Sequence, residues 1–354
     1  MNVSLIQKKQ TKCWDMNIED LGLFNFLVMN NSRRSFIKTS VTLATGAILA
    51  PNAYAKKVYN PIISNIPSNK VNSQTICVFT KCLQYLNYER LAQTLAKAGY
   101  NGADLSVRDS GHVQPEKVKS DLPRLVKTLQ KEGISTPMMV TTIIDAKDKY
   151  TESILATAAE MGIQHYRMGY INYDKTKTIP QNIDIVKRSF EQLEKLNRKY
   201  DIHGSYQNHS GTRVGGPVWD LYLLVKDLDP QYIGVQYDIR HAICEGGQSW
   251  SLGMELLAPW IKSCPIKDFI WQKTGNHWQI QDMPLGYGMV DFDAFLRKYV
   301  ELKLSGPFSI HLEYDLGGAD KGSRTPTMSH EKIAHCLKQD IDWFREKLKE
   351  HNLD

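Results

Sequence analysis

Short apolar runs alternate with longer amphipathic runs along most of the chain. Eight of the short runs are five to seven residues long and rich in β-branched residues. This pattern is typical of strands buried inside a parallel sheet. The predicted strands are residues 76–80, 103–107, 136–142, 165–169, 203–208, 233–238, 261–267 and 308–314.

The runs between these strands carry apolar residues at intervals of three and four, the spacing of one helix face. The predicted helices are residues 88–98, 118–132, 153–161, 183–199, 218–227, 292–302 and 330–350. Only the connection between the sixth and seventh strands is weakly helical in its pattern.

Strict alternation of strand and helix implies a parallel sheet, and eight such units favour an α/β fold, the closed (β/α)8 or TIM barrel, over a doubly wound open sheet. An open sheet that binds a dinucleotide would carry a GxGxxG loop after its first strand. The chain reads Phe79-Thr80-Lys81-Cys82 there. The sequence therefore predicts a barrel without a dinucleotide site.

Active sites of such barrels lie at the carboxyl ends of the strands, so polar residues at those ends are the candidates for chemistry. Six predicted strands carry them. They are Asp104, Arg108 and His112; Arg167 and Tyr170; Gln207, Asn208 and His209; Asp238 and His241; Lys267 and Asp268; and His311 and Glu313. Charges at the ends of apolar strands are costly unless they pair, bind a metal or contact a substrate.

Three of these groups have informative spacing. His311 and Glu313 alternate with aliphatic residues, so both face the lumen. Asp238 and His241 have a spacing that lets the imidazole fold back toward the carboxylate, although Asp-x-x-His is common by chance. Lys267 has two readings: burial lowers its pKa and makes it an acid or base, or it pairs with Asp268.

The charge is +6 over 354 residues, and an excess of three positive charges lies in residues 1–55. The remaining +3 does not supply the basic surface that nucleic acid needs. Residues 32–38 read Ser-Arg-Arg-Ser-Phe-Ile-Lys, and a short apolar run over 41–50 and Ala53-Tyr54-Ala55 follow. This order is typical of a twin-arginine export signal, and the apolar run is too short to cross a bilayer.

These features divide the chain into three parts. Residues 1–55 are predicted to be the export signal with an over-extended start, since Met29 is where such a signal would begin. Residues 56–74 form a linker, and residues 75–354 form the barrel. We expect the twin-arginine translocase to carry the protein to the periplasm, with cleavage near Ala55.

Five motifs, in order, resemble those of the xylose-isomerase-like barrel superfamily, in particular its sugar isomerase/epimerase and inosose-dehydratase-like members. The resemblance covers residues 75 to about 345. Its motifs are Tyr206-Gln207-Asn208-His209-Ser210-Gly211-Thr212, Asp238-Ile239-Arg240-His241, Pro265-Ile266-Lys267-Asp268, Leu285-Gly286-Tyr287-Gly288-Met289-Val290-Asp291-Phe292 and Leu312-Glu313-Tyr314-Asp315.

The resemblance implies one divalent metal ion, Mn, Mg, Co or Zn, held by residues of strands five to eight. Asp238 and Glu313 match two of the family's ligands. Ser205 aligns with the strand-five glutamate and Pro265 with the strand-seven histidine, and neither side chain can replace the missing ligation. Four residues could complete a rearranged site: Gln207, His209, His241 and His311.

The resemblance also implies an enzyme that works beside a carbonyl of a keto-sugar or inosose, by isomerisation, epimerisation or dehydration. This chemistry needs a base, an acid and a positive centre. The expected catalytic residues are Glu313, His209, His241 and Lys267. The expected substrate-binding residues are Arg167, His112, Gln207, His311, Asp268 and Trp250, the last stacking on a sugar from a flexible loop at 246–249.

Two other readings stay open at this point. A catalytically inactive sugar-binding barrel is suggested by Ser205 and Pro265. A nuclease that cuts at abasic sites belongs to the same superfamily, but the export signal and the low charge of the mature chain argue against a genomic DNA substrate. The sugar itself and the oligomeric state are not set by these patterns.

Overall fold

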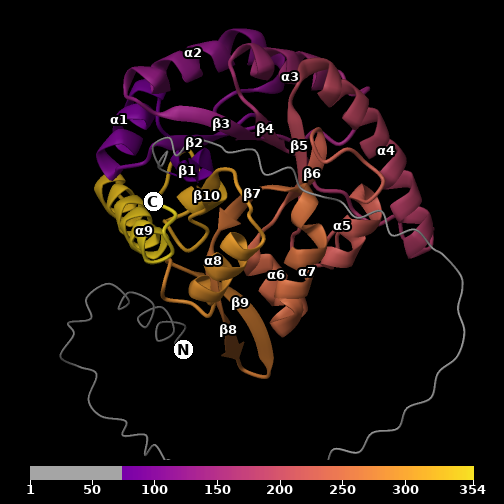
Figure 1. Ribbon diagram of the computed structural model, residues 1–354. Helices are drawn as coiled ribbons and strands as arrows, with labels where there is room; N and C mark the ends of the chain where they lie inside the picture. The colour runs from indigo at the N-terminus through magenta and orange to yellow at the C-terminus, as the bar shows by residue number, and fades with distance from the viewer. Residues whose placement is uncertain (1–73) are drawn as a thin grey trace, which may run out of the picture. The chain divides into compact units, whose positions relative to one another are not determined.

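The structure is a computed structural model, and it describes residues 74–354. The predicted export signal and almost all of the predicted linker lie outside the described residues. Eight parallel strands close into a barrel in the order β1-β10-β7-β6-β5-β4-β3-β2 (Figure 1). These strands are β1 Ile76–Phe79, β2 Gly102–Ser106, β3 Ser135–Val140, β4 His165–Arg167, β5 His203–Gln207, β6 Ile233–Gln236, β7 Ile261–Ile266 and β10 Phe308–Ile310. All eight predicted strands are confirmed, and the predicted TIM barrel with them.

Helices form a ring around the strands, and α9 packs beside α1 to close it (Figure 1). The helices are α1 Tyr88–Ala98, α2 Val118–Lys131, α3 Thr151–Glu160, α4 Ile179–Tyr200, α5 Val218–Val225, α6 Ile239–Gly246, α7 Trp250–Leu257, α8 Phe292–Glu301 and α9 His330–Glu350. The weak link between strands six and seven contains α6 and α7. Within residues 74–354, no helix combines the length and the apolar character needed to cross a membrane.

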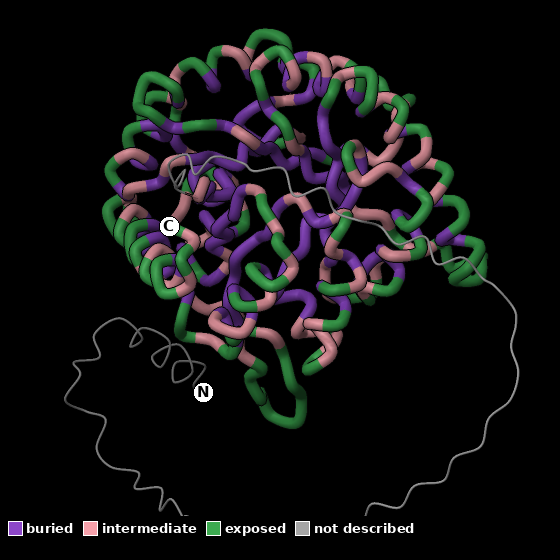
Figure 2. Tube along the Cα trace, viewed as in Figure 1, coloured by how far each residue is buried: buried purple, intermediate pink, exposed green. Residues whose placement is uncertain are grey.

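The core lies between the strands and the inner faces of the helices, and Figure 2 shows buried strands inside a rim of exposed helix surface. Aromatic rings fill the space where α9 meets the barrel: Phe308 and Phe344 lie 5.2 Å apart in an edge-on arrangement. One helix cap also belongs to the barrel mouth. Asp238 caps α6 by accepting a hydrogen bond from the His241 amide.

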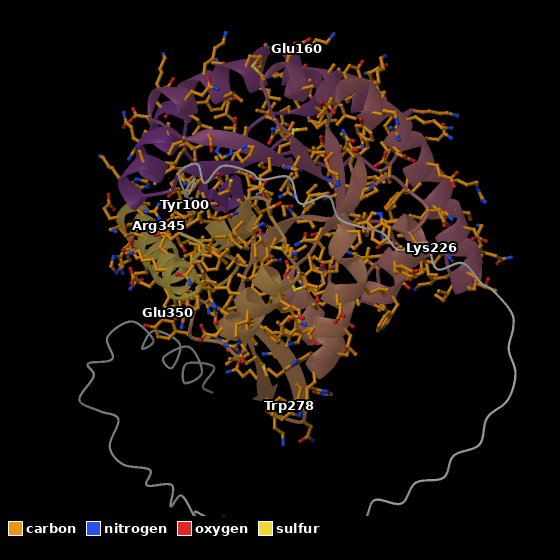
Figure 3. All side chains as sticks on the ribbon, viewed as in Figure 1. Tyr100, Glu160, Lys226, Trp278, Arg345 and Glu350 are labelled. Atoms are coloured by element: carbon orange, nitrogen blue, oxygen red, sulfur yellow. The ribbon has the colours of Figure 1, made fainter. Side chains whose placement is uncertain are left out.

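A two-stranded antiparallel hairpin follows β7, formed by β8 Asp268–Thr274 and β9 His277–Met283. The sequence analysis did not predict it. Gly275 has the positive φ of 61° that a two-residue type II′ turn needs at its first central position. Trp278 lies at the free end of the hairpin and is exposed (Figure 3). The alternating pattern around Gly275-Asn276 is typical of a hairpin, but it lies outside the alternation of strands and helices from which the elements were predicted.

Candidate active site

A buried lysine stands at the centre of the barrel mouth. Lys267, directly after β7, places its Nζ 2.8 Å from His241 Nε2, 2.9 Å from Asp238 Oδ2 and 3.4 Å from Glu313 Oε2. The ammonium group has three hydrogens, so these three acceptors satisfy it completely. Burial alone would lower the pKa of Lys267, but Asp238 and Glu313 raise it above its usual value. Lys267 is therefore a fixed positive charge, and the expected lowering of its pKa is wrong.

The carboxylate of Asp238 is fixed from the β5 side. Gln207 donates from Nε2 to Asp238 Oδ2 at 2.6 Å, and Asn208 exchanges two hydrogen bonds with the Asp238 backbone at 2.7 and 2.9 Å. The other end of the Gln207 amide accepts from Tyr170 at 2.7 Å and from Arg167 at 3.0 Å. Since both ends of the amide are engaged, Gln207 has a defined orientation and holds Asp238 toward Lys267.

Both ring nitrogens of His241 face groups that can only donate: Nε2 lies 2.8 Å from Lys267 Nζ, and Nδ1 lies 2.9 Å from Arg240 Nη1. A neutral imidazole accepts at one nitrogen only, and Arg240 Nη1 has a second acceptor in Ser210 Oγ at 3.2 Å, so we assign the lone pair to Nε2 and the ring proton to Nδ1. Ser210 Oγ is 2.9 Å from that nitrogen and can accept the proton's hydrogen bond. Burial, followed by the charge of Lys267, lowers the pKa of His241 well below its usual value. The imidazole is therefore neutral at physiological pH.

Glu313 is the part of this cluster that solvent reaches, with 23% of its side chain exposed. Lys81, after β1, contacts its other oxygen at 3.3 Å, and His311 Nδ1 lies 4.0 Å from the same oxygen. Burial would raise the pKa of Glu313, but Lys267 and Lys81 hold it well below its usual value. The predicted placement of His311 and Glu313 on one lumen face is confirmed.

His209 borders the cluster from the loop after β5. Its ring lies 4.0 Å from the ring of His241 and 4.7 Å from that of Tyr170. Its Nδ1 lies 3.0 Å from Ser210 O, which can only accept, so the proton lies on Nδ1 and Nε2 has a free lone pair. Burial and the nearby Lys267 lower the pKa of His209 to about 4. His209 is thus neutral and able to accept a proton at neutral pH.

A second acid lies deeper in the lumen. Asp104 on β2 is fully buried and accepts from Ser309 Oγ at 2.8 Å, while His311 Nε2 lies 3.8 Å away. Burial raises the pKa of Asp104 to about 7, against the lowering effect of Ser309 and Arg167. Its Oδ1 has no hydrogen-bond partner among the described residues.

Three predicted substrate-binding residues do not join this cluster. Asp268 turns away from Lys267 and accepts from the backbone amides of Phe269, Gly286, Gly288 and Val290, so it fixes the loop after β9. His112 lies 3.1 Å through Nε2 from the carbonyl of Leu83. Trp250 begins α7 and packs against the core, and the segment before it, Gly247–Ser249, is a 3-10 turn. Because the Asp268 carboxylate is engaged by these backbone amides, the alternative prediction that Lys267 pairs with Asp268 is also wrong.

The residues of the mouth do not fit the divalent ion that the resemblance implies. Lys267 Nζ lies between the two matching ligands, Asp238 and Glu313, where a cation would sit. Ser205 lies deeper in β5, with Oγ 3.0 Å from His203 Nδ1, and the β5 side chain that reaches Asp238 is Gln207. Among residues 74–354, no group of three or more His, Cys, Asp or Glu side chains is arranged to hold a metal.

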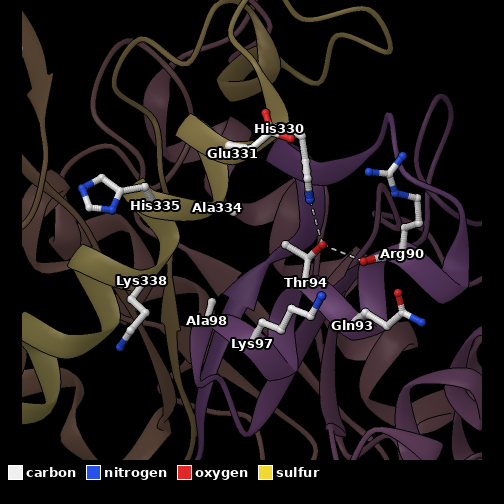
Figure 4. Close-up of a pocket in the computed structure, with 10 residues that line it drawn as sticks. All are labelled: Arg90, Gln93, Thr94, Lys97, Ala98, His330, Glu331, Ala334, His335 and Lys338. Atoms are coloured by element: carbon white, nitrogen blue, oxygen red, sulfur yellow. Dashed lines mark hydrogen bonds between the residues drawn. The ribbon is translucent and has the colours of Figure 1, made fainter.

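One cavity opens beside the barrel mouth. It has a volume of about 230 Å³ and is lined by residues that follow β3, β4 and β5, including Tyr170 and Arg213. Another of about 420 Å³ lies between α1 and α9, outside the barrel (Figure 4). The side chains of the second cavity include Arg90, Lys97 and Lys338, which are exposed, and none of the residues around Lys267.

Sequence reasoning missed two contributors to the site. Lys81 was read only as part of a segment that lacks a glycine-rich loop, although its place after the first strand puts it at the mouth. Arg240 forms an ion pair with Asp282 on β9 and donates to Ser210 Oγ at 3.2 Å. That pair depends on the hairpin, so it could not be foreseen without β8 and β9.

Comparison with known proteins agrees with this fold. The family described as the xylose isomerase-like TIM barrel matches residues 92–347. The chain belongs to this family. No curated protein matches the chain in sequence. The family assignment accounts for the barrel.

Solved structures with the same fold include sugar epimerases. A D-psicose 3-epimerase from Clostridium cellulolyticum H10, solved with D-tagatose, is 11% identical with a TM-score of 0.58, over 77% of this chain and 99% of that chain. A 3-keto-D-glucoside 4-epimerase from E. coli is 12% identical with a TM-score of 0.55, over 77% and 99%. The IOLI protein, solved with a zinc atom, is 16% identical with a TM-score of 0.58, over 75% and 96%. At these identities the likeness establishes the fold.

Proposed function

We propose that this protein is a carbohydrate isomerase, epimerase or dehydratase that works beside the carbonyl of a keto-sugar or inosose. The observation that carries the proposal is the Lys267 ammonium, buried between Asp238, His241 and Glu313 at the active-site end of the barrel. The family and its sugar epimerases support the substrate class.

The reaction would begin with removal of a proton from the carbon next to the carbonyl. Glu313 is ionised and reachable, and His209 has a free Nε2, so either can accept that proton. The electron pair of the broken C–H bond moves into an enediolate, whose oxygen needs a positive neighbour. Lys267 supplies it by exchanging its longest contact, 3.4 Å to Glu313, for the substrate oxygen. Return of the proton to carbon completes an isomerisation or epimerisation; in a dehydration the same proton passes to the β-hydroxyl, which leaves as water.

Lys267 supplies the positive charge that a divalent ion supplies in other proteins of this fold. Once a substrate oxygen has replaced Glu313, the ammonium is still held by Asp238 and the neutral His241 imidazole, so it stays in place when negative charge develops nearby. Gln207 contributes by keeping Asp238 in place rather than by donating an electron pair to a metal. This arrangement predicts catalysis that does not depend on added metal.

The test measures uptake of solvent deuterium into a panel of keto-sugars and inososes, with and without a chelator. We expect uptake into at least one compound, unchanged by the chelator and by added Mn²⁺. Glu313→Gln should slow it about 10²- to 10⁴-fold, the usual contribution of a general base. Glu346→Gln, at an exposed position on α9, is the matched control.

Absence of deuterium from every compound in the panel would overturn the enzymatic proposal. Uptake that requires added metal would overturn the role of Lys267 and leave a metal enzyme of the same class. Uptake that survives Glu313→Gln at full rate would assign the base to another residue, with His209→Asn as the next variant.

A catalytically inactive sugar-binding barrel is the second candidate. One observation favours it: all three hydrogens of the Lys267 ammonium are already satisfied by protein groups. Such a protein would bind a sugar without exchanging its protons. A nuclease is the weaker alternative, because abasic-site cleavage in this superfamily uses several metal ligands that the mouth does not gather.

Export to the periplasm is part of the same proposal. It rests on the Ser-Arg-Arg-Ser-Phe-Ile-Lys segment at 32–38 and on the small residues before the proposed cleavage at Ala55. A periplasmic location would expose the barrel to sugars before their uptake into the cell.

A further inference from the structure

Three arginines line the side of the barrel mouth opposite the Lys267 cluster. Arg108 follows β2, Arg167 ends β4 and Arg213 lies on the loop after β5. They alternate with two aromatic rings. Arg108 and Arg167 lie 5.3 and 5.8 Å from the centre of the Phe79 ring, and Arg167 and Arg213 lie 4.7 and 4.8 Å from the centre of the Tyr170 ring.

None of the three arginines forms an ion pair with a carboxylate within residues 74–354. Arg167 donates only to Tyr170 and Gln207, although the residue is 5% exposed, and its Nε has no partner among the described residues. The side chains of Arg108 and Arg213 donate no hydrogen bond there and lie half-buried at the mouth. A buried donor without a partner is costly unless a ligand completes it.

The charges on this side of the mouth do not cancel. Burial and the neighbouring Arg167 lower the pKa of Arg108, which shows that the two guanidinium groups repel each other. Asp104 interacts with Arg108 and Arg167, but burial raises its pKa to about 7, so it compensates only part of their charge. The cavity of about 230 Å³ opens beside Arg213 and Tyr170.

We propose that Arg108, Arg167 and Arg213 bind the anionic group of a charged carbohydrate, a carboxylate or a phosphate. The guanidinium group binds either anion through two parallel hydrogen bonds, and the rings of Phe79 and Tyr170 hold the arginine planes in place. The anion would face the arginines while the rest of the sugar reaches Lys267 and Glu313. The proposal therefore rests on the proposed function, and it narrows the substrate to acidic or phosphorylated sugars.

The cavity between α1 and α9 is also lined by basic residues, but it does not offer a comparable site. Its Arg90, Lys97 and Lys338 are exposed, and water already satisfies exposed cations (Figure 4). The arginines of the mouth differ because one of them, Arg167, is almost fully buried with a donor that has no partner within residues 74–354.

The test compares three probes by isothermal titration calorimetry: D-glucose, D-glucuronate and D-glucose 6-phosphate. The full-length protein should bind at least one charged probe about tenfold or more tightly than D-glucose, with a preference that weakens as salt is added. Arg108→Gln and Arg213→Gln should each remove most of that preference. Arg188→Gln, at an exposed position on α4, is the matched control and should keep it.

The comparison between the two charged probes identifies the anion as carboxylate or phosphate. The proposal is overturned if neither charged probe binds more tightly than D-glucose, or if both arginine variants keep the preference. Because the readout is binding, a protein that prefers charged sugars but exchanges no deuterium would refute the enzymatic proposal alone. The reverse result would refute the anion site alone.

Discussion

The two sides of the barrel mouth differ in whether their charged side chains are paired. On the side of β6, β7 and β10, Lys267 is matched by Asp238 and Glu313, and every hydrogen of its ammonium has an acceptor. On the side of β2 and β4, Arg108 and Arg167 have no carboxylate partner within residues 74–354. One side is complete as it stands, and the other leaves donors without acceptors.

This difference indicates that the two sides have different roles. A complete network has a defined geometry before any ligand arrives, which is what stabilisation of a developing charge requires. An incomplete cluster of like charges is held together by the fold and relaxes when an anion enters. The paired side thus suits chemistry, and the unpaired side suits recognition.

Removal of the central lysine tests the paired side and should have the largest effect on stability. Lys267→Met would leave the fully buried Asp238 without its cation, while Glu313 would keep its contact with Lys81. We expect the free energy of unfolding to fall by about 3–5 kcal/mol, the usual result of breaking a buried ion pair from one side. Urea unfolding followed by circular dichroism measures it.

Lys187→Met is the control, because Lys187 pairs with an exposed Asp227 on the helix ring. Its loss should cost about 1 kcal/mol or less. An equal loss in the two variants would show that the pairing at the mouth is not a buried network.

Asp104 lies between the two sides, and its titration should produce a smaller effect that depends on pH. Its pKa of about 7 in the folded protein lies above that of an exposed aspartate, so the folded state keeps a proton that the unfolded chain releases. The contribution of Asp104 to stability is present at low pH and is lost as the pH rises toward 7. Asp104→Asn should therefore gain about 2 kcal/mol relative to the wild type between pH 5 and pH 8.

Urea unfolding at the two pH values measures this difference. Asp109→Asn, at an exposed position on the loop that follows β2, is the control. A constant difference between Asp104→Asn and the wild type at both pH values would contradict burial as the cause of the raised pKa.

The fold was predictable from the sequence because strand burial and helix amphipathicity are local patterns. All eight barrel strands and the residues at their ends follow from those patterns, including His311 and Glu313 on one face. The β8–β9 hairpin was missed because its alternation lies outside the β-α repeat. The hairpin strands carry partly exposed residues, so they lack the continuous apolar run of a barrel strand.

The sequence predicted which residues lie in the site better than it predicted which of them contact one another. Lys267 and Asp268 are neighbours in sequence but have different partners, because Lys267 ends at the barrel mouth while Asp268 begins β8 and accepts from backbone amides of the loop after β9. Ser205 and Gln207 share a face of β5, and only the depth of each in the lumen shows which one reaches Asp238. Depth depends on strand tilt and register, which one chain's residue pattern does not determine.

Tyr170 contacts both sides of the mouth, and substitutions that remove its hydroxyl or its ring should have the smallest of the predicted effects. Its hydroxyl donates to Gln207 on the paired side and accepts from Arg167 at 2.8 Å, while its ring lies against Arg167 and Arg213 on the unpaired side. Tyr170→Phe removes the hydroxyl alone and leaves Arg167 its hydrogen bond to Gln207, so we expect a loss of about 1 kcal/mol in stability with the preference for the charged sugar retained. Tyr170→Leu also removes the ring and should weaken binding of that sugar roughly twofold to fivefold, the size of a cation–π contact. Urea unfolding and calorimetric titration measure the two effects, and equal losses of binding in both variants would show that the hydroxyl, rather than the ring, positions the arginines.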